Sequence, residues 1–221
     1  MTAVTHPRLP ARRAATRART WWGKAWVRAV EESSYAEGDL RIGRTLARAG
    51  RVGPITIEAG RFFAAVEDED PGAVSVTVPV LDPTSVELLV ELIGAESGRI
   101  AALLAGDLPL QLVEEADESG VELLPYGGEL GASCTCNAWV DPCPHALAVA
   151  LQVTWLLEAD PLVLTHLRGL PRDRLLARLH ERGGSAEEAA DDVETGLEAM
   201  LRAERILDLV DQPGSSIDHL F

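Results

Sequence analysis

Residues 133–145 read Ser-Cys-Thr-Cys-Asn-Ala-Trp-Val-Asp-Pro-Cys-Pro-His and contain all three cysteines of the 221-residue chain. Cys134 and Cys136 form a Cys-x-Cys pair, and Cys143 and His145 form a Cys-x-His pair after six intervening residues. Three thiolates and one imidazole complete a tetrahedral ligand set for Zn²⁺ and leave no position for water or substrate. That arrangement is typical of a structural zinc site rather than a catalytic one. The stretch therefore predicts one structural zinc ion.

The same spacing predicts the local structure around the ligands. The first pair is expected on alternate residues of a strand or tight turn, and the second pair at the start of a helix. The apolar run 146–157 then continues that helix. Pro144 suits the first helical turn, because its missing N–H would have no partner there. A helix N-terminus beside the site would also stabilise its net negative charge.

Other cysteine and histidine sites fit this stretch less well. A redox site needs Cys-x-x-Cys, whereas the first pair here is Cys-x-Cys. A zinc deaminase needs His-x-Glu upstream of Pro-Cys-x-x-Cys. Pro142 and Cys143 are present, but the His-x-Glu and the second cysteine are not. Four unrelated core residues would rarely crowd into twelve positions, so the zinc interpretation is preferred.

The four ligand positions match the pattern CxCx(n)CxH one for one, and residues 131–157 resemble the SWIM zinc finger. A looser similarity to small bacterial SWIM-domain proteins lies in Trp21-Trp22-Gly23-Lys24-Ala25-Trp26 and in Glu31-Glu32-Ser33-Ser34. The resemblance implies a module that binds DNA or proteins. It also implies a helicase-like nucleic-acid translocase as a partner, because bacterial proteins of this kind often occur alongside one.

Charge is distributed unevenly along the chain, whose net charge is −15. Residues 1–54 hold 11 Lys and Arg against 4 Asp and Glu, a net +7, whereas residues 55–221 hold 9 against 31, a net −22. This distribution argues against a protein that coats nucleic acid with its whole surface. The candidate nucleic-acid contacts are therefore confined to the N-terminal quarter: Arg12, Arg13, Arg17, Arg19, Lys24, Arg41, Arg44, Arg48 and Arg51.

Composition bounds the class of protein. A hydrophobic content of 47% is enough to bury a core, which argues against global disorder. Three cysteines cannot form a complete disulfide framework, and no apolar signal region follows the N-terminus, so a cytoplasmic protein is expected. The longest apolar run, 146–157, is too short to span a bilayer, and no membrane association is expected.

Hydrophobic periodicity predicts an α+β protein with an N-terminal helix, a small antiparallel sheet, further helices and a zinc finger leading into a helical C-terminal part. The sheet is predicted as a three-stranded meander over 53–58, 61–67 and 73–81. Helices are predicted over 21–33, 83–96, 98–105, 109–118, 144–157, 160–167, from 171 onward, and 186–210. Residues 41–51 are interpreted as a basic ridge or loop. Trp22 and Trp26 recur at helical spacing and favour a packed face over a base-stacking one.

Four regions are predicted along the chain. They are a flexible basic arm over 1–20, an α+β domain over 21–130, the zinc finger over 131–157 and a helical region over 158–221. An enzyme is not expected, because the chain has no nucleophile elbow, no phosphate-binding glycine loop and no Glu beside the zinc motif. The favoured hypothesis is an adaptor that acts with a helicase-like protein partner. The alternative is a DNA-binding protein that uses its N-terminal arginines, mainly through phosphates.

Overall fold

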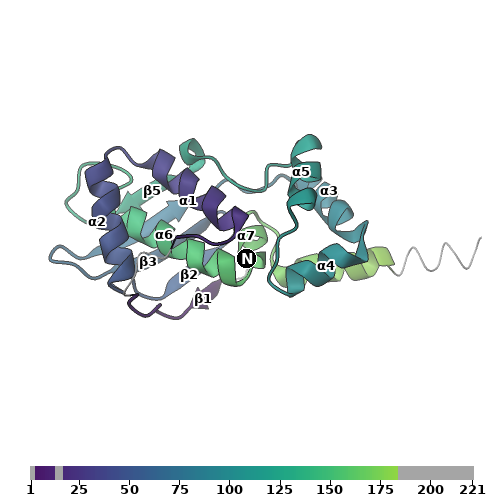
Figure 1. Ribbon diagram of the computed structural model, residues 1–221, viewed down its shortest axis with the longest axis horizontal. Coiled ribbons are helices and arrows are strands. Elements are labelled where there is room, and N and C mark those ends of the chain that lie inside the picture. The colour runs from purple at the N-terminus through teal and green to yellow at the C-terminus, as the bar shows by residue number, and fades with distance from the viewer. Residues whose placement is uncertain (1–2, 13–16, 184–221) are drawn as a thin grey trace, which may run out of the picture. The chain divides into compact units, whose positions relative to one another are not determined.

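The computed structural model describes residues 3–12 and 17–183, and Figure 1 shows its ribbon. The chain divides into two compact units, the first Met1–Leu176 and the second Ala177–Phe221. The first unit contains the sheet and every labelled helix. Of the second unit, residues 177–183 are described, and they are helical within the segment 172–183. The boundaries predicted at residues 20, 130 and 157 all lie inside the first unit.

A five-stranded antiparallel sheet forms one layer of the first unit, with the strand order β1-β2-β3-β4-β5. Its strands are β1 (Val4–His6), β2 (Ile55–Glu58), β3 (Arg61–Val66), β4 (Gly72–Thr77) and β5 (Gly131–Cys134). The predicted meander is confirmed as β2, β3 and β4. Side chains alternate between a buried face and a more exposed one, as expected for a sheet covered on one side. The buried face includes Ile55, Ile57, Phe62, Val74 and Val76.

The N-terminal segment is partly ordered by this sheet, which corrects the prediction of a flexible arm over residues 1–20. Val4 pairs with Ile57 in the antiparallel register of β1 and β2. Further along, the Arg12 backbone N–H donates to the carbonyl of Arg48 over 2.8 Å. A strand of three residues is too short to show the period-2 pattern, so β1 could not be predicted from hydrophobic periodicity. Residues 1–2 and 13–16 of the predicted arm lie outside the described residues.

The labelled helices are α1 (Trp21–Ser33), α2 (Glu37–Arg48), α3 (Pro83–Gly94), α4 (Ser97–Leu104), α5 (Leu110–Glu118), the 3-10 helix η1 (Gly127–Glu129), α6 (Pro144–Ala159) and α7 (Leu162–Leu167). All of them except α2 and η1 begin and end close to the predicted residues. The predicted N-cap of α1 is confirmed, since the Thr20 hydroxyl accepts from the Gly23 N–H over 3.0 Å. Asp82 caps α3 in the same way. The acidic helix predicted over 186–210 lies outside the described residues.

Helix α2 corrects the interpretation of residues 41–51 as a loop or ridge. Its buried residues are Leu40, Gly43, Leu46 and Ala47, a helical spacing. Gly43 is needed for packing rather than for flexibility, because a Cβ at this position would lie 2.8 Å from the Cβ of Leu147 on α6. The two helices therefore approach closely at this point.

Helix α6 is the central element of the first unit. Twelve of its 16 residues are buried, so it has no polar face, and it lies between the sheet and the pair α1 and α2 (Figure 1). The indole N–H groups of Trp22 and Trp26 donate to the carbonyls of Leu157 and Ala150 on α6, both over 3.0 Å. The two tryptophans are 4% and 0% exposed. They are core residues, as predicted.

No helix in the described part of the chain is long and apolar enough to cross a membrane. Helices α3, α4 and α5 pack on one another in a small helical group. The buried Arg99 joins them, donating to the carbonyl of Leu92 and to the carboxylates of Glu96 and Glu115, each over 2.8 Å. Its charge is therefore paired where it is buried, as it must be.

Candidate metal centre

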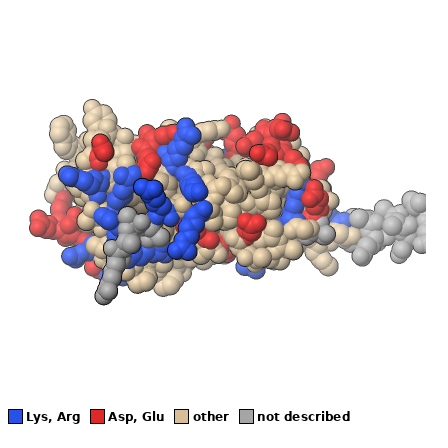
Figure 2. Space-filling view, viewed as in Figure 1, with Lys and Arg blue, Asp and Glu red and all other residues tan. Residues whose placement is uncertain are grey.

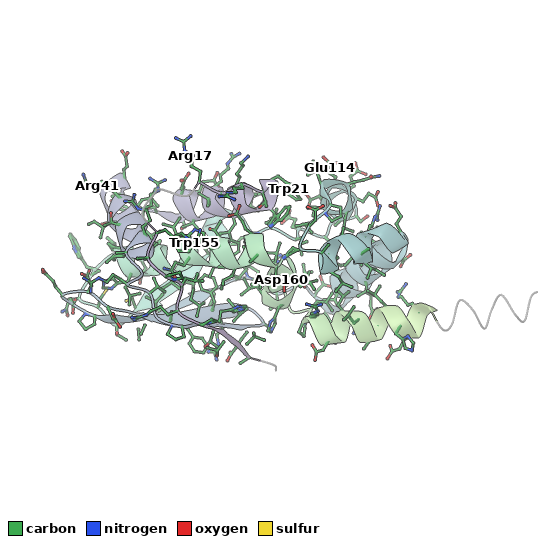
Figure 3. All side chains as sticks on the ribbon, turned by 60° about the horizontal axis from the view of Figure 1, so that its bottom comes forward. Arg17, Trp21, Arg41, Glu114, Trp155 and Asp160 are labelled. Carbon is green, nitrogen blue, oxygen red and sulfur yellow. The ribbon has the colours of Figure 1, made fainter. Side chains whose placement is uncertain are left out.

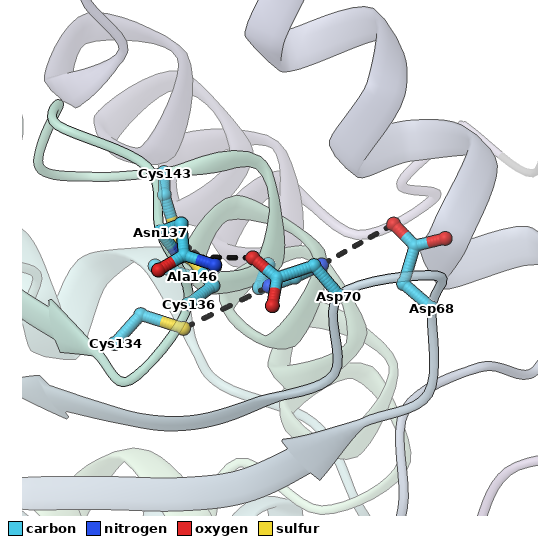
Figure 4. Close-up of polar contacts among 8 residues, drawn as sticks. Asp68, Asp70, Cys134, Cys136, Asn137, Cys143 and Ala146 are labelled. Atoms are coloured by element: carbon cyan, nitrogen blue, oxygen red, sulfur yellow. Dashed lines mark hydrogen bonds and ion pairs between the residues drawn. The ribbon is translucent and has the colours of Figure 1, made fainter.

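The four predicted zinc ligands come together at the junction of β5 and α6. Cys134 ends β5, Cys136 follows in the next turn, Cys143 is the N-cap residue of α6, and His145 lies in its first turn. One ligand atom from each residue lies within 4.8 Å of all the others (Figure 4). Within residues 3–12 and 17–183, this is the one group of three or more His, Cys, Asp or Glu side chains with such an arrangement.

Two distances between ligand atoms match the edges of a tetrahedral zinc site. The Sγ atoms of Cys136 and Cys143 are 3.7 Å apart, and the Cys134 Sγ is 3.7 Å from the His145 Nδ1. With Zn–S near 2.3 Å and Zn–N near 2.05 Å, a regular tetrahedron has S–S edges of about 3.8 Å and S–N edges of about 3.6 Å. The cluster is therefore the ligand set of one structural zinc ion, with Nδ1 as the ligand atom of the histidine.

Zinc binding at this cluster is coupled to deprotonation of its cysteines. Burial raises the pKa of the Cys134 thiol to about 12, and burial also raises the pKa of the Cys143 thiol. Without a metal, both residues would thus stay protonated at neutral pH. A bound zinc deprotonates its thiol ligands and stabilises them as thiolates, so ion binding and local folding are coupled.

Backbone hydrogen bonds hold the two halves of the site in place. Thr135 donates its N–H to the carbonyl of Ala73 over 3.1 Å, and its hydroxyl accepts from the Ala73 N–H over 2.9 Å. The carboxylate of Asp70 accepts from the Asn137 N–H over 2.9 Å. At the start of α6, the Ala146 N–H points to the Cys143 Sγ over 3.5 Å, so the positive end of the helix meets a thiolate.

Asp68 supports the histidine from outside the ligand set, as Figure 4 shows. Its Oδ2 lies 3.3 Å from the His145 Nε2, the ring nitrogen that does not face the cysteines. A carboxylate in this place fixes the tautomer and the ring orientation of a zinc-bound histidine. Sequence reasoning missed Asp68, because it lies 77 residues before His145 and only the turn between β3 and β4 brings them together.

Replacing Asp68 with alanine is expected to weaken zinc binding by about 10- to 100-fold, because the histidine loses its orienting partner. Competition with a chelator of known zinc affinity would measure the change. Glu69→Gln is the matched control, since it removes a neighbouring exposed carboxylate that does not contact the histidine. Equal affinities for Asp68→Ala and the control would mean that the carboxylate does not support the site.

A basic groove is the second candidate site, and several of the predicted nucleic-acid-contacting residues line it. It has a volume of about 650 Å³ between α1, α2 and α6. Figure 2 shows Lys and Arg gathered over these helices and Asp and Glu gathered over α3 and α5. The predicted contacts that line the groove are Arg17, Lys24, Arg41, Arg44 and Arg48.

The other predicted contacts lie elsewhere. Arg12 lines a smaller adjoining groove of about 380 Å³, which also includes Arg48. Arg19 and Arg51 line neither groove. Arg13 lies outside the described residues. Five of the nine predicted contacts therefore line one groove, and their contact with nucleic acid stays a prediction.

The groove residues that sequence reasoning missed include Arg28, Thr154 and Trp155. Trp155 lies on α6, and the Arg12 guanidinium sits 3.8 Å from the centre of its ring. In Figure 3, Arg17 and Arg41 extend away from α6 toward the same side of the molecule. The residues on α6 are more than 100 positions from the arginines, so no local pattern links them.

The cations of the groove are only partly neutralised. Arg44 pairs with Glu31, and Arg28 pairs with Glu32 over 2.7 Å. Arg17, Lys24 and Arg41 make no ion pair with any residue that the structure describes. Uncompensated like charges that converge on a concave surface attract anionic ligands.

Comparison with known proteins agrees with the geometry of the metal centre. Residues 116–153 match the family model of the SWIM zinc finger, from the last turn of α5 to most of α6. This segment contains all four ligands. The resemblance stated from the ligand pattern is confirmed, and the chain carries a zinc-binding SWIM finger.

One curated relative aligns beyond the finger. The chain is 27% identical over 181 residues to "Uncharacterized protein Rv2102" of Mycobacterium tuberculosis (strain ATCC 25618 / H37Rv). The alignment covers 80% of this chain and 65% of that protein, so the chain spans somewhat less than two thirds of the relative's length. No solved structure matches the chain significantly.

Proposed function

We propose that this protein is a zinc-stabilised, non-enzymatic nucleic-acid-binding protein whose contact surface is the basic groove. The observation that carries the proposal is the convergence of six cationic side chains on one concave surface. They are Arg17, Lys24, Arg28, Arg41, Arg44 and Arg48. A chain with a net charge of −15 has no general affinity for a polyanion, so a local cluster of this kind indicates a dedicated anion site.

The zinc ion contributes to this function through α6. Its ligands Cys143 and His145 begin the helix, and the later turns of the same helix supply Leu151, Thr154 and Trp155 to the groove. Zinc binding would order the start of α6 and so fix the floor of the groove. Four protein ligands leave no position for a water or a substrate, and we therefore assign the metal no catalytic role.

Phosphates are the expected target of the groove cations. Each phosphate that a Lys or Arg neutralises releases condensed counterions, which makes the affinity fall as the salt concentration rises. The salt slope is about −0.9 per contact for B-form DNA and about −0.7 for single strands. Arg17, Lys24 and Arg41 are the sharpest targets for mutation, because no ion pair competes for them within the described residues.

The triple variant Arg17→Ala, Lys24→Ala and Arg41→Ala is expected to lower the magnitude of the salt slope by about 2–3, since three phosphate contacts are removed. Fluorescence anisotropy with a labelled oligonucleotide, titrated at several salt concentrations, would measure both slope and affinity. Deleting residues 1–20 is a poorer test, because it also removes β1 from the sheet.

The matched control removes the same number of cations outside the groove, at Arg61, Arg172 and Arg174, which are all exposed. A general effect of net charge would act on both triple variants alike. The proposal requires the groove variant to lose most of the binding and the control to retain it. Equal losses, or no detectable binding by the unmodified chain, would contradict it.

A protein-binding adaptor is the second candidate function, and one residue of the finger favours it. Trp139 lies between Cys136 and Cys143 in the zinc loop and is 97% exposed. Exposed tryptophans are enriched among the residues that dominate protein interfaces. The SWIM resemblance implies a helicase-like translocase as the partner. Purification of the chain with and without nuclease separates the two candidates, since a partner retained by the chain but lost by Trp139→Ser after nuclease treatment supports the adaptor.

A further inference from the structure

We infer that the groove takes a single strand of nucleic acid and stacks one of its bases on the ring of Trp155. This inference rests on the proposed function and adds to it the class of ligand and a residue that contacts a base. It depends on the shape of the groove, on the chemistry of its floor, on the contact that Trp155 already makes and on the cations of the second hollow.

The shape of the groove favours a single strand over a duplex. Proteins that bind duplex DNA usually insert a protruding helix or strand ribbon into the major groove. Here the cations do not protrude on one element. They line a hollow of about 650 Å³, with walls from α1 and α2 and a floor from α6. A hollow of this size accommodates a few nucleotides of an unpaired strand but not the width of a duplex.

The floor of the groove is suited to a flat apolar group. Val27, Ala47, Leu151 and Trp155 supply apolar surface beneath the cations. Thr154 also lines the groove, but its side chain is buried at 2% exposure and adds little polar surface to the floor. A nucleobase supplies a flat face that this surface can cover.

Trp155 already holds a planar group in the structure. The Arg12 guanidinium lies 3.8 Å from the ring centre, the distance of a stacked cation–π contact. The ring face can thus carry a flat group, although the guanidinium occupies it in the structure. A base that replaces the guanidinium would leave Arg12 beside the phosphates of the same strand. Aromatic platforms within a basic groove are the usual means of binding single strands without strong sequence preference.

Cations also lie beyond the main groove. Arg48 lines both the main groove and the smaller one, where Arg12 is a further lining residue. A small anion such as free phosphate or a mononucleotide would engage only some of these cations. Their spread over two hollows therefore favours a polymer with several phosphates in sequence.

Trp155→Leu tests the inference, because leucine keeps apolar volume but removes the aromatic face. The affinity for an oligothymidylate of about 12 nucleotides is expected to fall by about 5- to 150-fold, the measured range for loss of one base-stacking contact. Trp155→Phe should retain most of the affinity. Tyr35→Leu is the matched control, since Tyr35 is 84% exposed and does not line the groove.

Two further probes separate the possible outcomes. An abasic strand of equal length should bind the unmodified chain as weakly as the normal strand binds Trp155→Leu, and a duplex should compete poorly. If Trp155→Leu binds as well as Tyr35→Leu while the groove arginines still matter, phosphates are bound without stacking and the inference is wrong. If the groove arginines do not matter either, the proposed function itself has failed.

Discussion

Replacing Cys143 with serine is expected to abolish stoichiometric zinc binding and to lower the free energy of unfolding by more than about 3 kcal/mol. Structural zinc contributes folding free energy on the order of 10 kcal/mol in isolated zinc fingers. A smaller loss is expected here, because a large apolar core also stabilises this chain. Cys143 is 0% exposed and is both a zinc ligand and the N-cap residue of α6. Its replacement therefore destabilises the start of α6, the central helix of the first unit.

Elemental analysis and thermal unfolding would measure the two effects. A chain of this length is expected to lose roughly 6–12 °C in Tm for a 3 kcal/mol change. Ser133→Ala is the matched control, because it alters the exposed residue next to Cys134 without touching the ligand set. Chelation of the unmodified protein should reproduce the result for Cys143→Ser. One zinc per chain in the variant, at an unchanged Tm, would contradict the assignment of the ligands.

The ligand set and the helix after it were predictable because their signals are local. Twelve consecutive positions contain all four ligands and the start of α6. The length of the apolar run 146–157 predicted that a helix follows the last ligand. Likewise, Val74, Val76 and Val78 alternate with period 2, so β4 followed directly from the pattern.

The missed helix α2 shows where local signals mislead. Its glycines and arginines suggest a loop, because glycine lowers helix propensity and charged residues dilute the apolar stripe. Leu40, Gly43 and Leu46 do recur at helical spacing. However, glycine is not a sign of a buried helix face in the sequence, and its burial becomes evident only from the close approach of α6. Tertiary packing overrides the propensity of the segment in this case.

The groove was unpredictable for a different reason. Its cations come from α1, α2 and the segment before α1, whereas Trp155 and Thr154 come from a helix more than 100 residues later. The sequence located the basic quarter of the chain but not its concave shape. The charge asymmetry favoured an adaptor with an acidic surface, whereas the convergence of unpaired cations favours a nucleic-acid ligand.

Gly72 is the residue of the metal centre that the sequence identified least well, and its replacement by alanine has a large expected effect. In the sequence it follows Pro71, and a Pro-Gly pair is typical of a turn. In the structure, a Cβ at this position would lie 2.6 Å from the Cys134 Sγ and 2.9 Å from the His145 Nδ1. The site therefore needs glycine for space.

Alanine at position 72 must push two zinc ligands out of place, because a bound zinc holds both ligand atoms at fixed distances. Metal sites need ligand distances within about 0.2 Å of their normal values. We therefore expect Gly72→Ala to weaken zinc binding by more than about 100-fold. This loss is larger than the one expected for Asp68→Ala, which removes only a carboxylate outside the ligand set. Competition with a chelator would measure the affinity of each variant.

Gly38→Ala provides the control for the same chemical change. A Cβ at Gly38 meets no atom within 4 Å, and alanine in α2 should stabilise the helix by about 0.5–1 kcal/mol. Unfolding measured with and without chelator then isolates the role of the site. If Gly72 acts through the metal, Gly72→Ala destabilises the zinc-bound protein strongly and the chelated protein little. An equal loss in both states would mean that the close packing at Gly72 serves the sheet and not the zinc.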